Sequence, residues 1–124
     1  MKQKQGKITV PPGTRVLPHE LMTATILSWT GDDVEFLPVR STHYPDIVFR
    51  GRQWEMKAPK GSKRRTIENN IRHALEQSNN IIIDLARINI PENVCIKNIS
   101  DRAKKLGKSK KFIIVTKSRK IIEL

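Results

Sequence analysis

Cysteine, aromatic residues and long apolar stretches are scarce in this chain of 124 residues. The single cysteine, Cys95, excludes an intrachain disulfide and a cysteine-based zinc cluster. No apolar run approaches the roughly 20 residues that a membrane-spanning helix needs. The start of the chain, Met1 to Thr9, is polar and basic and lacks the apolar region of a signal peptide. We therefore expect neither a membrane span nor a signal peptide.

Acidic residues are also few. The chain has 12 aspartates and glutamates against 24 lysines and arginines, a formal net charge of +12. Such an excess favours a polyanionic partner, either a nucleic acid or an anionic membrane surface, and we favour a nucleic acid. A basic protein without such a partner is the alternative. The length suits one domain with a real core.

The first half of the chain predicts an extended lead-in, a helix and a strand. We expect residues 1–17 to be extended or frayed and residues 18–124 to form a single domain. Pro18 suits the first turn of a helix that reaches about Trp29, and Gly31 ends it. We expect both tryptophans, Trp29 and Trp54, in the core. The predicted buried stripe of the helix is Leu21, Met22, Thr25, Ile26 and Trp29. Residues 34–39 are predicted to form the first strand.

The second half predicts a strand, a helix and a buried parallel strand. A helix is expected from Thr66, as its N-cap, to about Asn79, with Glu68 in its first turn. The apolar run Ile81 to Leu85 is typical of a central strand covered on both faces, which implies a parallel crossover. A short helix over 94–106 and a hairpin of 112–116 with 120–124 follow. The fold class is α/β, a mixed central sheet with flanking helices.

Charged residues gather around a predicted hairpin, residues 45–57. If Arg50-Gly51-Arg52 is its turn, Phe49 pairs with Gln53 and Ile47 with Glu55, which brings Asp46 beside Glu55. Lys57 shares a face with Glu55 because side chains alternate along a strand. Like charges are seldom placed together unless a positive group lies between them, so we expect a divalent cation there. A plain cross-strand salt bridge is the alternative.

The pattern Pro45-Asp46, then Glu55-Met56-Lys57, resembles the core motif of the PD-(D/E)XK nuclease superfamily, whose restriction-endonuclease-like core we therefore expect. The resemblance implies that Asp46, Glu55 and Lys57 are catalytic and that Glu20, on the preceding helix, completes the metal site. A charge that favours the helix N-terminus is the alternative for Glu20. Carboxylates and the Met56 carbonyl favour Mg²⁺, with Mn²⁺ or Zn²⁺ as alternatives. Lys57 would position or deprotonate the attacking water.

A longer pattern, from the segment 54–59 through the Ile81–Leu85 run, resembles the C-terminal nuclease domain of contact-dependent growth inhibition (CdiA) toxins. This resemblance implies a tRNA nuclease, a toxin-like effector that acts in the cytoplasm of a target cell, with an acidic immunity protein as a partner. It also implies that three residues of the second helix lie near the active centre or its substrate: Thr66, Asn70 and Gln77.

Two basic segments are candidates for contact with a nucleic-acid backbone, with a solvated surface as the alternative. They contribute the predicted nucleic-acid-binding residues Lys60, Lys63, Arg64, Arg65, His73, Lys104, Lys105 and Lys108. Two other functions stay open. One is a DNA endonuclease of a mobile element, of resolvase or restriction type. The other is a non-catalytic nucleic-acid-binding module.

Overall fold

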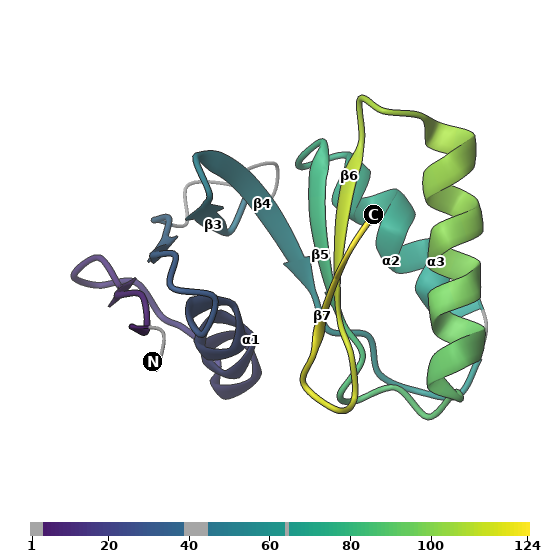
Figure 1. The fold of residues 1–124 in the computed structure, drawn as a ribbon, viewed down its shortest axis with the longest axis horizontal. Helices are drawn as coiled ribbons and strands as arrows, with labels where there is room; N and C mark the ends of the chain where they lie inside the picture. The colour runs from purple at the N-terminus through teal and green to yellow at the C-terminus, as the bar shows by residue number, and fades with distance from the viewer. Residues whose placement is uncertain (1–3, 39–44, 64) are drawn as a thin grey trace.

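The computed structural model describes residues 4–38, 45–63 and 65–124. Within them, three helices flank a curled, mixed sheet of seven strands, whose order across the sheet follows the order along the chain (Figure 1). The elements are β1 (Ile8–Thr9), α1 (Pro18–Ser28), β2 (Val34–Phe36), β3 (Ile47–Phe49), β4 (Arg52–Lys57), α2 (Arg65–Leu75), β5 (Asn80–Asp84), α3 (Glu92–Leu106), β6 (Lys111–Val115) and β7 (Ile121–Glu123).

The strand directions confirm most of the predicted topology. β2, β3 and β4 are antiparallel, whereas β4, β5 and β6 are parallel, and β7 returns antiparallel to β6. The predicted parallel crossover through the second helix and the final hairpin are thus confirmed. β1 adds a parallel edge to β2 from within the predicted lead-in. The division of the chain at residue 17 stays a prediction.

The β3–β4 hairpin has a two-residue turn, so the predicted three-residue turn is wrong. Phe49 pairs with Arg52 and Ile47 with Trp54. Arg50 and Gly51 both have positive φ, 53° and 73°. A two-residue turn with positive φ at both positions matches the right-handed twist of the flanking strands. Extending this register by one pair places Asp46 opposite Glu55.

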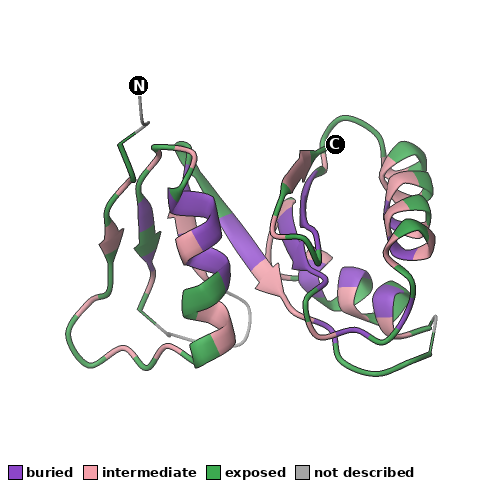
Figure 2. Cartoon of the chain, turned by 60° about the horizontal axis from the view of Figure 1, so that its bottom comes forward, coloured by how far each residue is buried: buried purple, intermediate pink, exposed green. Residues whose placement is uncertain are grey.

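Both faces of the sheet are covered, as predicted for β5. Ile81 and Ile83 pack in the core beneath α2 and α3, and Ile82 packs in the core beneath α1. Trp54 is buried in the α1 core, which confirms its prediction. Figure 2 shows that the buried segments line the inner sides of the sheet and helices. No described helix is long and apolar enough to cross a membrane.

Helix α1 buries a different side from the one predicted. Of the predicted stripe only Ile26 is buried, and Trp29 is 53% exposed, so its placement in the core is wrong. The buried side is built largely of small side chains, including Ala24 and Ser28. A helix seated on small residues can approach the sheet more closely than one seated on tryptophan and methionine. The helix ends at Ser28, one residue short of the predicted end.

The other predicted boundaries shift by a few residues. Helix α2 begins at Arg65, so Thr66 lies in its first turn and is not the N-cap, and the helix ends at Leu75 instead of Asn79. Helix α3 begins two residues before the predicted Val94. The strand predicted over 34–39 ends at Phe36, and its residue 39 lies outside the described residues.

A buried ion pair ties α1 to the sheet. Asp84, at the end of β5, accepts hydrogen bonds from the Thr23 hydroxyl of α1 at 2.6 Å and from the Ala86 amide at 2.8 Å. The Arg119 guanidinium, from the β6–β7 turn, donates to both carboxylate oxygens of Asp84 at 3.0 and 3.1 Å. The carboxylate is 4% exposed, so the pair is well desolvated and fully hydrogen-bonded.

Replacing Asp84 with alanine should destabilise the fold strongly. Arg119 would lose its counter-ion in a largely buried place, which typically costs about 3–5 kcal/mol. Urea unfolding monitored by circular dichroism measures the change. Asp101→Ala is the matched control, because Asp101 pairs with Lys97 on the surface of α3 and should change stability little. Equal effects of the two substitutions would contradict the role of the Asp84 pair.

Candidate active site

The predicted carboxylate pair is formed in the structure. Asp46 precedes β3 and Glu55 lies in the middle of β4, on neighbouring antiparallel strands. The Met56 amide donates to Asp46 Oδ2 at 2.8 Å, and the Asp46 amide donates to the Trp54 carbonyl at 2.9 Å. The backbone contact continues the hairpin register, and the Met56 amide fixes the Asp46 carboxylate beside β4.

Glu55 is a buried acid that the described residues only partly satisfy. It is 3% exposed, and its Oε1 atom has no hydrogen-bond partner within the described part of the chain. Its other oxygen, Oε2, lies 3.3 Å from the Lys57 ammonium, which comes from the same face of β4. An unpaired buried carboxylate oxygen is costly in a folded protein, so its presence points to a ligand.

Burial and the neighbouring carboxylate determine the protonation state of Glu55. Burial, together with a hydrogen bond and the charge of the neighbouring Asp46, raises the pKa of Glu55 to about 8, and Lys57 offsets part of this rise. Two adjacent carboxylates tend to hold one proton between them, and the single Lys57 ammonium offsets only part of their repulsion. Near neutral pH, the free protein therefore keeps Glu55 largely protonated.

Glu20 lies in the first turn of α1. Its Oε1 atom accepts a hydrogen bond from the Leu17 amide at 2.8 Å, so it caps the first turn of α1. No group of three or more His, Cys, Asp or Glu side chains in the described part of the chain could hold a metal ion. Glu20 thus has the contact expected of its alternative role at the helix start, and its part in a metal site with Asp46 and Glu55 stays a prediction.

Helix α2 presents the predicted polar side chains on one flank. Its buried stripe packs beneath the sheet, and Glu68 on one flank pairs with Arg102 of α3 at 3.3 Å. The opposite flank, away from α3, carries the predicted residues, and there the Asn70 amide donates to the Thr66 carbonyl at 2.7 Å. Because α2 packs on β4 and β5, this flank lies on the side of β4. It consists of the half-buried Thr66, Asn70 and Gln77 and the exposed His73.

The predicted basic residues fall into two separate groups. Lys60 and Lys63 are exposed on the segment that follows β4, and Arg65 is exposed at the start of α2. Arg64 lies outside the described residues. Lys104, Lys105 and Lys108 are exposed at the far end of α3 and in the loop after it. The two segments lie at opposite ends of the molecule, bottom and top in Figure 1. Only the first group directly follows the carboxylate pair in sequence.

Comparison with known families identifies the chain. Residues 43–121 match the family model "Contact-dependent growth inhibition CdiA C-terminal domain", and this match spans more than half of the chain. The chain belongs to this family. It is thus a toxin-effector domain of contact-dependent growth inhibition, which confirms that part of the sequence prediction.

A solved structure shares the fold of this CdiA C-terminal domain. A chain of the CdiA-CT/CdiI toxin and immunity complex from Burkholderia pseudomallei superposes with a TM-score of 0.67 at 20% sequence identity, covering 96% of this chain and 98% of that chain. At this identity the likeness shows the fold alone. Comparison with curated protein sequences gave no match.

Stability should depend on pH through Glu55. The folded-state pKa, about 8, exceeds the ordinary value of 4.5, so the folded chain holds a proton that the unfolded chain releases between these values. In metal-free buffer, stability should fall as pH rises through this window, by at most about 1.4 kcal/mol per pH unit. Glu55→Gln stays neutral and should remove this contribution, making the variant more stable than the wild type at pH 8.

The control for this experiment is Glu35→Gln, on the exposed side of β2, which should keep the wild-type pH dependence. Urea unfolding in EDTA between pH 5 and pH 8.5 measures all three proteins. A Glu55→Gln variant whose stability parallels the wild type across that range would show that Glu55 is not held protonated by the fold.

Proposed function

We propose that this domain is a metal-dependent endonuclease of the PD-(D/E)XK type that hydrolyses phosphodiester bonds in RNA, with tRNA as the favoured substrate, in the cytoplasm of a target cell. The observation that carries the proposal is the Asp46–Glu55 pair beside Lys57, with one buried oxygen of Glu55 left unpartnered. A protein that only binds nucleic acid gains nothing from two adjacent carboxylates facing phosphate.

The residues fit a hard divalent cation. Asp46, Glu55 and the Met56 carbonyl would hold it, and the unpartnered Glu55 oxygen is the atom that a cation would satisfy. Two protein carboxylates with substrate oxygens and water are the usual partners of Mg²⁺, so we favour Mg²⁺, with Mn²⁺ or Zn²⁺ as alternatives. When bound, such an ion lowers the pKa of a water and offsets the charge that develops on phosphorus.

The chain's own groups would orient the attacking water and stabilise the charge that develops on the phosphate. The Met56 amide holds the Asp46 carboxylate in place, and the Lys57 ammonium is half-buried beside Glu55. A fixed ammonium in a partly desolvated place stabilises negative charge on a phosphoryl oxygen far better than one in water does. Lys57 would also position the attacking water, and the half-buried flank of α2 would line the substrate side.

RNA is favoured over DNA by the resemblance of the 54–85 pattern to tRNA nuclease domains, and a polyanionic substrate is favoured by the net charge of +12. The loop of Lys60 and Lys63 follows the catalytic strand and would contact the phosphate backbone near the cleaved bond. We also propose an acidic immunity protein as a partner. This rests on membership of the family and on the neighbour structure, which is a toxin and immunity complex.

Removing the charges of the site should abolish cleavage. Asp46→Asn, Glu55→Gln and Lys57→Met keep side-chain size, and each should lower the cleavage rate by about 100-fold or more because it removes a ligand or the fixed ammonium. Total tRNA and plasmid DNA are digested side by side with Mg²⁺, Mn²⁺ or Zn²⁺, or with EDTA. Lys97→Ala on the surface of α3 is the control lysine.

Each outcome of this digestion is informative. Cleavage of tRNA that requires metal supports the proposal, and cleavage of plasmid DNA alone supports the mobile-element alternative. Binding of either nucleic acid with no metal-dependent cleavage by the wild type would leave the non-catalytic module. Circular dichroism of each variant separates lost chemistry from lost folding.

Glu20 can be assigned by two substitutions. A glutamine can cap the first turn as a glutamate does, whereas an alanine cannot. We expect Glu20→Ala to cost about 1 kcal/mol of stability and Glu20→Gln to cost little, with tRNA cleavage by Glu20→Gln equal to that of the wild type. Thermal unfolding and the cleavage assay measure both. A large loss of cleavage in a stable Glu20→Gln variant would return Glu20 to the metal site.

A further inference from the structure

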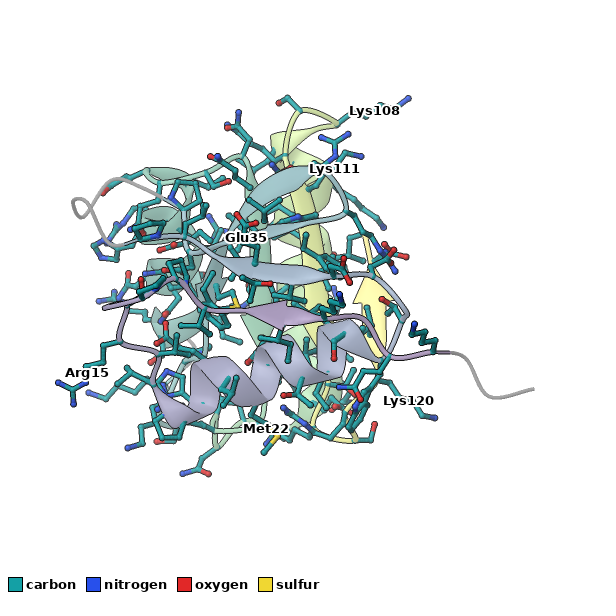
Figure 3. All side chains as sticks on the ribbon, turned by 90° about the vertical axis from the view of Figure 1, so that its left-hand side faces the viewer. Arg15, Met22, Glu35, Lys108, Lys111 and Lys120 are labelled. Carbon is teal, nitrogen blue, oxygen red and sulfur yellow. The ribbon has the colours of Figure 1, made fainter. Side chains whose placement is uncertain are left out.

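Helix α1 exposes large apolar side chains on its outer side. Among the described residues, six large apolar side chains are exposed, and five of them lie between residues 10 and 29. They are Val10, Leu17, Leu21, Met22 and Trp29, with Met22 55% and Trp29 53% exposed. Leu21, Met22 and Trp29 lie on the side of the helix opposite Ala24 and Leu27, which are fully buried against the sheet. Figure 3 shows α1 facing outward, with Met22 projecting from it.

This face has the composition of an interface. A helix with one side in the core and the other in water is normally polar outside, and α1 is apolar on both sides. Clustered exposed apolar residues on a protein of this size mark interaction sites, and tryptophan and methionine are enriched at the centres of such sites. We refer to Leu21, Met22 and Trp29 as the α1 outer face.

A positively charged cavity adjoins the α1 outer face. It has a volume of about 250 Å³, and its wall includes Met22, His19, Arg87 and Arg119 together with the Asp84 carboxylate. Arg119 is neutralised by Asp84, to which it donates two hydrogen bonds. Arg87 has no carboxylate partner among the described residues, and its guanidinium donates to the Ala58 carbonyl at 3.2 and 2.5 Å. The cavity is thus suited to a single carboxylate.

The face is unsuited to nucleic acid and to a second copy of the chain. The segment 18–29 contains no lysine or arginine, so it offers no partner to a phosphate backbone. Two copies meeting on this face would bring together two chains of net charge +12 and two positively charged cavities, which repel one another. Arg15 and Lys120 are exposed, and Figure 3 labels them on either side of α1 in that view.

We propose that the α1 outer face and the cavity beside it bind an acidic protein, which places apolar side chains on Leu21, Met22 and Trp29 and one carboxylate near Arg87 and His19. Within the proposed function this protein is the immunity protein, so the identity of the partner rests on that function. The apolar centre gives the affinity and the basic rim selects an acidic partner.

The test uses the full chain and the purified protein encoded by the gene next to it. Met22→Glu and Trp29→Glu place a charge in the centre of the face, at positions already exposed to water, and should each weaken binding about 30-fold or more by calorimetry. His19→Glu should weaken binding by repelling the carboxylate. Leu124→Glu is the control, because Leu124 is 44% exposed and lies outside this face.

Three results would overturn the proposal. The first is that Met22→Glu and Trp29→Glu bind the protein encoded by the adjacent gene as tightly as the wild type does, or that the wild type does not bind it. The second is a wild-type dimer in sedimentation that Met22→Glu dissociates, which would assign the face to a second copy. The third is loss of tRNA affinity in Met22→Glu by fluorescence anisotropy, which would assign it to nucleic acid. Failure of the wild type to cleave nucleic acid would refute the catalytic proposal and leave the binding result standing.

Discussion

Strand β4 is the constraint on which the site depends, because it pairs with β3 on one side and with β5 on the other. It therefore joins the antiparallel half of the sheet to the parallel half. Trp54 is buried in the α1 core, and strand geometry then turns Glu55 to the opposite face, beneath the α2 side. Burying the tryptophan on one face therefore directs the glutamate to the other face, where α2 covers it.

Burying that glutamate makes the free domain less stable than it could be. Glu55 loses its hydration, lies beside Asp46 and keeps one oxygen unpaired, and Lys57 offsets only part of this cost. Asp84, another buried acid of the sheet, is instead fully hydrogen-bonded and paired with Arg119. The contrast separates an acid that serves the fold from an acid pair that is suited to chemistry.

The sequence predicted what depends on short-range spacing. The acid pair and Lys57 lie within twelve residues on adjacent strands, so their proximity along the hairpin could be predicted. Their shared face could not follow from the predicted three-residue turn, which would pair Ile47 with Glu55. The two-residue turn places Asp46 opposite Glu55. The order of the elements and the parallel strand could also be predicted from local signals, because β-branched runs mark the strands and helix-stop residues mark the helix ends. Arg50 was beyond this reasoning, since nothing in an arginine favours the positive φ that the two-residue turn requires.

The buried side of α1 could not be predicted because the helix is apolar all round. Periodicity then selects the larger side chains, and packing selected the smaller ones, since Ala24 and Ser28 let the helix lie close to the sheet. The error is informative, because it leaves Met22 and Trp29 in water where a polar surface would suffice for folding alone. The Asp46–Glu55 pair and the apolar outer side of α1 thus lie on opposite faces of one sheet. Their chemistries do not overlap, so a polyanionic substrate and an acidic protein partner can each be selected by a different face.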